Sequence, residues 1–207
     1  GYLTQWETPI FERVVYKIDV KLLIKRGFLC PVVSNGGGVK IDVSKVKHKG
    51  GEFLDSALES LYMSKTVEIV ADIVKKGIDR KAWLIFCVSI EHAEQVTAEL
   101  ISHGINTACY HSQSDNDYIL DDFTHGRLKC LVNVNILTTG SNFPIADMCV
   151  LIRATESTAL YVQIVGRVMR LYPDKQNALL LDYGGNVMRH GCIDDVIVKA
   201  KGEGTGE

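Results

Sequence analysis

Strands and helices alternate in the second half of this 207-residue chain, and this pattern constrains the fold more than any other feature. Residues 83–88 form a continuous apolar run, which suits a strand that is buried on both faces. Further strands are expected at 105–110, 128–134, 148–152 and 178–182, with helices at 91–102, 115–125 and 157–171. Strands joined by helices of about ten residues predict an α/β fold with a parallel sheet and right-handed crossovers.

The first part of the chain is less regular. A short helix is expected at 19–26, where Gly27 ends it, and a helical pattern with a break near Ser64 covers residues 52–76. Strands at 29–33 and 39–43 flank Ser-Asn-Gly-Gly-Gly, which predicts a hairpin. We therefore expect an irregular interdomain linker segment with a hairpin over residues 1–50, an α/β domain over 51–191 and a C-terminal tail over 192–207.

Composition describes an ordinary globular protein, with 46% hydrophobic residues and a net charge of −2. Residues 1–81 carry 14 Lys and Arg against 10 Asp and Glu, whereas residues 82–207 carry 9 against 15. No global basic field exists, so any contact with nucleic acid is expected to be local. The six cysteines lack metal-binding spacing and indicate reduced core residues of a cytoplasmic protein. No apolar run approaches the roughly 18 residues of a membrane span, so no membrane partner is expected.

Residues 163–170, Gln-Ile-Val-Gly-Arg-Val-Met-Arg, carry the strongest chemical signal. On a helix, Arg167 and Arg170 would project from one face, and Gln163 lies four residues before the first of them. Gly166 would let a backbone or a ligand come close. Two planar guanidinium groups suit a polyphosphate, although an isolated pair of this kind more often belongs to an amphipathic helix with solvated arginines.

Other polar residues collect after the predicted strands, and in parallel sheets ligands gather at the carboxyl ends of the strands. Residues 135–144 could offer backbone N–H groups and hydroxyls to phosphate or sugar oxygens, or could form a turn capped by its own side chains. Asp121 and Asp122 are expected to be surface charge. A basic patch is either a phosphate contact or, more commonly, a solvated loop: Lys40, Lys45, Lys47, His48 and Lys49.

Three segments resemble, in order and in spacing, the last three motifs of superfamily 2 helicases: residues 83–89, 137–144 and 163–170. Residues 181–191 are similar to the segment that ends the same domain in DEAD/DEAH-like DNA helicases allied to repair and restriction translocases. Residues 16–31 are similar to the passage that links the two motor domains in that group. The resemblance implies the C-terminal RecA-like domain of a two-domain motor, with ATP in the cleft between the domains.

The resemblance also implies roles for individual residues. Arg170 would be the arginine finger and Arg167 a second phosphate ligand. The nucleotide site would further include Gln163, Gly140 and Asn142, although the family usually has Asp where this chain has Asn142. Contacts to the sugar-phosphate backbone of a nucleic-acid strand would come from Ser89, His111 and Thr138, and His111 could equally be a capping or core residue.

The phosphate loop, its lysine and the acids that hold magnesium belong to the first motor domain of such proteins, and this sequence contains none of them. The resemblance therefore implies that ATP and Mg²⁺ are bound mainly by an N-terminal RecA-like domain of a larger parent. The chain begins without Met, which suggests an excised domain that is inactive alone. We expect the motor domain of an ATP-dependent DNA helicase or translocase that binds DNA independently of sequence. The alternatives are an RNA helicase domain or a non-catalytic RecA-like module that binds nucleic acid or protein.

Overall fold

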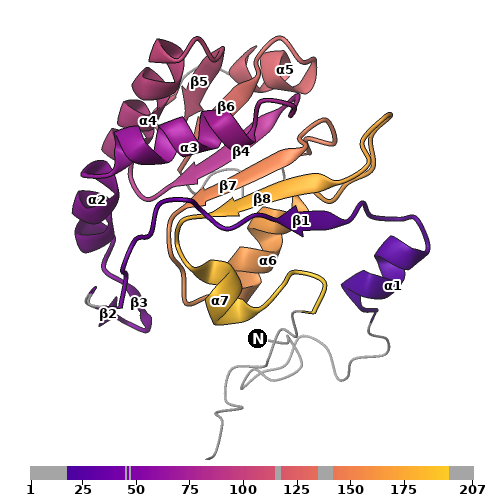
Figure 1. Cartoon of the computed structure of the whole chain (residues 1–207), viewed down its shortest axis with the longest axis horizontal. Coiled ribbons are helices and arrows are strands. Elements are labelled where there is room, and N and C mark those ends of the chain that lie inside the picture. The colour runs from indigo at the N-terminus through magenta and orange to yellow at the C-terminus, as the bar shows by residue number, and fades with distance from the viewer. Residues whose placement is uncertain (1–17, 45, 47, 115–117, 135–141, 196–207) are drawn as a thin grey trace, which may run out of the picture.

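A six-stranded parallel sheet forms the centre of the fold, with strand order β1-β8-β7-β4-β6-β5 (Figure 1). The computed structural model describes residues 18–44, 46, 48–114, 118–134 and 142–195. The strands are β1 Val32–Ser34, β4 Trp83–Cys87, β5 Thr107–Tyr110, β6 Cys130–Asn133, β7 Met148–Ile152 and β8 Ala178–Asp182. The predicted α/β fold with a parallel sheet is confirmed.

Helices cover both faces of this sheet (Figure 1). They are α1 Val20–Lys25, α2 Asp55–Met63, α3 Thr66–Lys76, α4 Ile90–Ser102, α5 Tyr118–Thr124, α6 Thr158–Gly166 and α7 Asn186–His190. The break predicted near Ser64 separates α2 from α3. No helix in the described part of the chain has the length and apolar character needed to cross a membrane.

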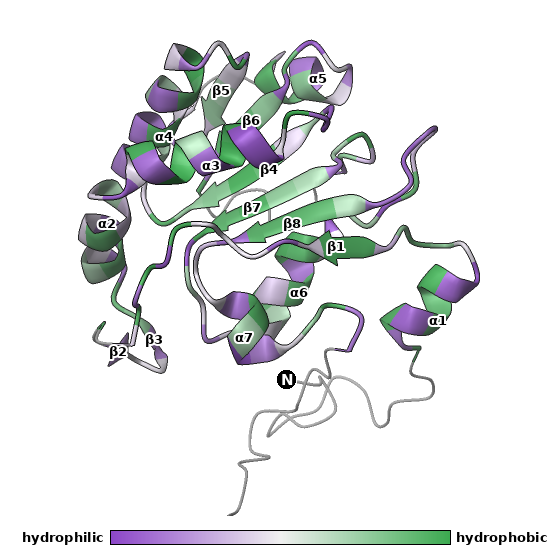
Figure 2. Cartoon of the chain, viewed as in Figure 1, coloured by the Kyte–Doolittle hydropathy of each residue, from purple (hydrophilic) through white to green (hydrophobic). Residues whose placement is uncertain are grey.

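The central strand β4 divides the core into two layers because successive side chains of a strand point to opposite faces. Ile85 and Cys87 pack with residues of α2, α3 and α4, whereas Leu84 and Phe86 pack with residues of α5 and α6. All five residues of β4 are fully buried, and Figure 2 shows the central strands as hydrophobic along most of their length. A continuous apolar run is therefore the expected sequence for this strand.

The hairpin predicted around the triple glycine is wrong. β1 pairs with β8 in parallel, and residues 39–43, all of them described, form no strand. The glycines serve close packing instead, since a Cβ at Gly37 would lie 2.5 Å from the ring of Tyr183. The hairpin lies further on, where β2 His48–Lys49 pairs with β3 Glu52–Phe53 in antiparallel fashion. Part of the predicted linker, residues 32–34, thus forms an edge strand of the main sheet.

The described cysteines are all free thiols. Four of them are buried in the core, as predicted: Cys30, Cys87, Cys130 and Cys149. Cys192 is exposed, so the prediction of a core position is wrong for this residue. Burial raises the pKa of the Cys109 thiol to about 11, which keeps this partly buried group protonated at neutral pH. These thiols behave as small hydrophobic groups.

Candidate functional site

The arginine segment, residues 167–170, follows α6 rather than lying within it. The helix begins after the Ser157 cap, whose hydroxyl accepts a hydrogen bond from Leu160 N at 3.2 Å, and it ends at Gly166. Arg167 is the C-cap residue, and Arg170 lies outside the helix. The prediction that the helix continues to residue 171, with both arginines on one helical face, is wrong.

Tertiary hydrogen bonds explain why the helix ends early. Val168 and Met169 continue the apolar pattern and are buried. Their carbonyl oxygens accept hydrogen bonds from the Cys30 thiol at 3.4 Å and from the Cys30 amide at 2.8 Å. The chain therefore leaves the helix to join the segment that precedes β1, and this turn carries Arg167 and Arg170.

Arg170 reaches a residue from another predicted motif. Its Nη1 donates a hydrogen bond to Oδ1 of Asn142, which is exposed. Burial lowers the pKa of Arg167 from its ordinary value, and the positive charge of Arg170 lowers it further. The two guanidinium groups are thus near enough to interact. The amide of Asn142 accepts the hydrogen bond that a carboxylate would accept, but it adds no negative charge.

These residues lie at the amino edge of the sheet. Cys30, which pairs with Met169, precedes the first residue of β1, and Asn142 lies shortly before β7. Gln163 is exposed on α6, three residues before the helix ends. The two arginines therefore lie at the edge opposite to the carboxyl ends of the strands.

Ser89 lies at the opposite edge, after the carboxyl end of β4. Its hydroxyl accepts a hydrogen bond from His92 N at 3.2 Å and thereby caps α4, and it donates a hydrogen bond to Glu59. The proton of the hydroxyl and one of its two acceptor positions are thus used within the domain. A contact between Ser89 and nucleic acid stays a prediction.

His111 follows β5 at the same carboxyl edge. Its Nδ1 accepts a hydrogen bond from Gln113 N at 3.3 Å, and its backbone amide donates to Ser114 Oγ at 2.9 Å. Its Nε2 lies 4.0 Å from a carboxylate oxygen of Glu94. This geometry is that of a residue that caps a turn, and a role in nucleic-acid binding stays a prediction. Thr138 and Gly140 lie outside the described residues.

The segment at 181–191 ties the ends of β7 and β8 together. Oδ1 of Asn186 accepts a hydrogen bond from Thr155 N at 3.0 Å, and its Nδ2 donates to Arg153 O at 2.8 Å and to Asp182 Oδ1 at 2.8 Å. A Cβ at Gly184 would lie 2.1 Å from Arg153 O, so only glycine fits there. In this domain the motif holds the carboxyl edge in shape.

Other charged groups noted in the sequence make contacts within the domain. Asp121 and Asp122 both pair with Arg127 on the surface, as predicted. His48 of the basic patch packs against Phe53, with ring centroids 4.4 Å apart and the rings inclined by 36°. Within the described residues no group of His, Cys, Asp and Glu is arranged to hold a metal ion.

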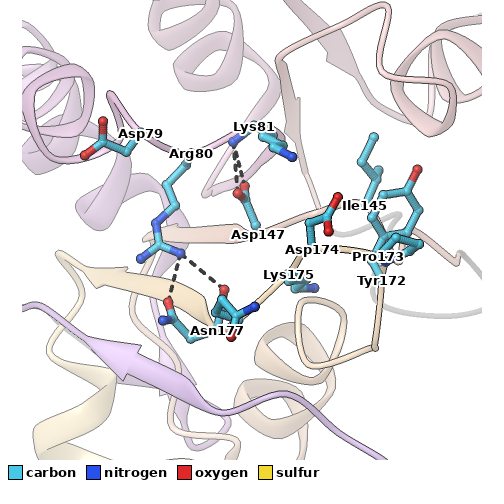
Figure 3. Close-up of a pocket in the computed structure, with 11 residues that line it drawn as sticks. Asp79, Arg80, Lys81, Ile145, Asp147, Tyr172, Pro173, Asp174, Lys175 and Asn177 are labelled. Carbon is cyan, nitrogen blue, oxygen red and sulfur yellow. Dashed lines mark hydrogen bonds between the residues drawn. The ribbon is translucent and has the colours of Figure 1, made fainter.

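A polar pocket of about 180 Å³ lies beside the arginine segment at the amino edge (Figure 3). Arg80 Nη1 donates hydrogen bonds to the backbone oxygen and the side-chain oxygen of Asn177, at 3.2 and 2.9 Å. The carboxylate of Asp147 accepts hydrogen bonds from the backbone amide of Lys81 at 2.9 and 3.0 Å. These polar groups satisfy one another, and they hold the loops of the amino edge together.

Residues 65–172 match the family described as the helicase conserved C-terminal domain. The chain belongs to this family, as the resemblance in the sequence predicted. It is 28% identical over 185 residues to a candidate ATP-dependent helicase of Saccharomyces cerevisiae, IRC3, and covers 27% of that protein. It is also 28% identical over 159 residues to a 51.5 kDa protein of a Lactococcus phage, of which it covers 34%. The chain thus spans about a third or less of these relatives.

Solved structures support the same fold. A fragment of a candidate HsdR subunit of a type I restriction enzyme from Vibrio vulnificus YJ016 superposes with a TM-score of 0.69 at 24% identity, over 90% of this chain and 38% of that one. The C-terminal domain of the DEAD-box protein Dbp5 gives a TM-score of 0.50 at 22% identity, over 60% of this chain and 73% of that one. The fold is therefore RecA-like.

Proposed function

We propose that this chain is the C-terminal motor domain of an ATP-dependent DNA helicase or translocase and supplies Arg170 as its arginine finger. The observation that carries the proposal is the grouping of Arg170, Arg167 and Asn142 in loops at one edge of a helicase C-terminal domain. A side chain in a loop beyond the helix end can reach a ligand held by a second domain. The sequence contains no phosphate loop, so the second domain would hold ATP and Mg²⁺.

The chemistry of phosphoryl transfer suits this arrangement. Negative charge spreads over the γ-phosphate in the transition state, and an arginine from another domain stabilises it by a factor of about 10³ to 10⁵ in rate. Arg170 would take this role, with Arg167 as a second phosphate ligand. Gln163, exposed on α6, would link the nucleotide to the domain interface. Asn142 would orient Arg170 without neutralising its charge.

Ser89 and His111 at the carboxyl edge would contact the sugar-phosphate backbone of a nucleic acid, without sequence preference, and Thr138, which lies outside the described residues, would add a third contact. DNA is the first candidate track, because residues 181–191 resemble DNA helicases and an LlaBIII restriction enzyme solved with DNA shares the fold, with a TM-score of 0.55 at 15% identity. RNA is the second, because a Caenorhabditis elegans relative named as an RNA helicase, glh-4, is 25% identical over 201 residues.

The test is ATP hydrolysis by the full-length parent protein with and without single-stranded DNA or RNA. We expect turnover to rise with one nucleic acid and to fall by about 10³-fold or more in Arg170→Ala, while ATP binding is largely retained. Arg167→Ala should also lose turnover. The matched control is Arg127→Ala, which removes an arginine paired with surface carboxylates.

Each alternative has its own outcome. Retained turnover in Arg170→Ala would refute the arginine-finger role. A wild-type parent that binds nucleic acid but hydrolyses no ATP would instead indicate a RecA-like binding module. Stimulation by RNA alone would change the track and leave the finger assignment intact.

A further inference from the structure

The ammonium group of Lys175 donates hydrogen bonds to three backbone carbonyls. Nζ lies 3.2 Å from Pro144 O, 2.6 Å from Ala146 O and 2.9 Å from Arg170 O. A lysine ammonium has three N–H donors and no acceptor, so these bonds use all of them. Burial lowers the pKa of Lys175 from its ordinary value, and the neighbouring Asp147 and Cys30 oppose that shift.

These carbonyls belong to the two segments that form the arginine site. Pro144 and Ala146 follow Asn142 in the loop before β7, and Arg170 is the proposed finger. Lys175 therefore holds the backbone of Arg170 to the loop whose Asn142 accepts a hydrogen bond from the Arg170 side chain. Arg170 is restrained at its backbone and at its guanidinium group.

The turn that precedes Lys175 directs it toward this site. Lys175 N donates to Tyr172 O at 3.1 Å, and Asp174 adopts a left-handed backbone conformation with φ 64°. This conformation is unfavourable for a residue with a side chain, so the surrounding structure has to stabilise it. Figure 3 shows Lys175 in the wall of the polar pocket, beside Asp174. With its three donors engaged, it is not available as a ligand-binding cation of that pocket.

We infer that Lys175 is a positioning residue that fixes Arg170 against the Asn142 loop in the geometry needed for phosphoryl transfer. The inference rests on the proposed function, because it assigns to Lys175 a role that acts through Arg170. Hydrogen bonds from a charged donor are stronger than neutral ones, which suits a clamp between two loops. A displacement of about 1 Å at a reacting group can cost about 10²-fold in rate.

The experiment measures kcat and KM for ATP in the full-length parent protein. Lys175→Met keeps the length and apolar stem of the side chain and removes all three donors. We expect kcat to fall by about 10- to 100-fold, with KM for ATP within threefold of wild type. The control is Arg80→Met, which removes a basic residue of the same pocket that contacts Asn177 rather than the arginine segment. Its kcat should stay within twofold of wild type.

A double-mutant cycle separates positioning from general stability. Arg170→Lys serves as the second variant of the cycle. Lysine keeps the positive charge but lacks the planar guanidinium group, so we expect a reduced but measurable rate. If Lys175 acts through Arg170, Lys175→Met should cost less than threefold when added to Arg170→Lys. Thermal unfolding of each variant verifies that the protein is folded at the assay temperature.

The outcomes distinguish this inference from the proposed function. Multiplicative effects in the cycle, or equal losses in Lys175→Met and Arg80→Met, would overturn the positioning role. If Arg170→Ala is inactive but Lys175→Met stays within twofold of wild type, only the role of Lys175 fails. If Arg170→Ala keeps its turnover, the proposed function fails first. Should Lys175→Met not fold, Lys175→Gln, whose shorter side chain and single amide group cannot bridge all three carbonyls, enters the same cycle, and wild-type kcat there would overturn the inference.

Discussion

Replacing Gly166 by alanine would separate stability from function at the arginine segment. Gly166 is the last residue of α6, its φ lies outside the left-handed region, and a Cβ built on it meets no atom within 4 Å. Alanine therefore fits the fold without strain. Because glycine is a poorer helix former, we expect Gly166→Ala to raise the free energy of unfolding by about 0.5 to 1 kcal/mol.

Function should respond in the opposite direction. In the proposed motor, the open space beside Gly166 is where a nucleotide or the neighbouring domain comes close to the backbone. An added methyl group would hold that partner off by roughly the length of a carbon–carbon bond, about 1.5 Å. Since a displacement of about 1 Å can cost about 10²-fold, we expect turnover by the parent protein to fall on the order of 10-fold or more.

The assay pairs urea unfolding of this chain with ATP hydrolysis by the full-length parent. The matched control is Gly184→Ala, in which the new Cβ would lie 2.1 Å from the Arg153 carbonyl oxygen. That change should lower the free energy of unfolding by about 1 to 3 kcal/mol. Unchanged turnover in a folded Gly166→Ala parent would refute close approach at this glycine, and a loss of stability would refute our account of the local geometry.

Two further predictions concern α4. His92 is fully buried, stacks on Tyr62 and has no hydrogen-bond partner at either ring nitrogen among the described residues, and burial lowers its pKa from 6.5 to about 4. As pH falls, the unfolded chain therefore takes up the proton first, so about 3 kcal/mol of stability is lost between about pH 6.5 and 4. His92→Phe should flatten this pH dependence of the free energy of unfolding in urea titrations. An unchanged slope would contradict the assignment to His92. Ser89→Ala should lower the free energy of unfolding by about 1 to 3 kcal/mol, because it removes the helix cap and the hydrogen bond to Glu59. The affinity of the parent for single-stranded nucleic acid should stay within threefold. Ser102→Ala, at the exposed end of α4, is the control and should change stability little. Weaker binding without lost stability in Ser89→Ala would favour the predicted nucleic-acid contact.

The strands of the second half could be predicted because each buried strand is a continuous apolar run. The bounds of β7 and β8 agree with the prediction at both ends. β1 was assigned to a hairpin because its parallel partner, β8, lies more than a hundred residues further on, and local periodicity carries no information about such a partner. The glycines after β1 favour a turn in the sequence, although Gly37 packs closely against the ring of Tyr183.

The candidate site could be predicted in its residue types but not in its geometry. Val168 and Met169 extend the apolar helical period, but their carbonyl oxygens accept hydrogen bonds from Cys30 in the folded domain, a partner that local periodicity cannot predict. Nothing in the sequence predicts a buried role for Lys175, because a lysine in a polar loop is normally solvated. Its role depends on carbonyls about thirty residues earlier in the chain, which the fold brings within 3.2 Å.

The candidate residues occupy two edges of the domain, and this separation limits how the edges can influence each other. Ser89 and His111 follow the carboxyl ends of β4 and β5, whereas Arg167 and Arg170 lie near the amino ends of β1 and β7. Strands of four or five residues separate the edges by about 13 to 17 Å. The helix α6 spans this distance with its inner face buried, so it cannot slide without disturbing the core. We therefore expect hydrolysis of the nucleotide to move Ser89 and His111, the residues predicted to contact nucleic acid, by rotation of the whole domain rather than by rearrangement within it.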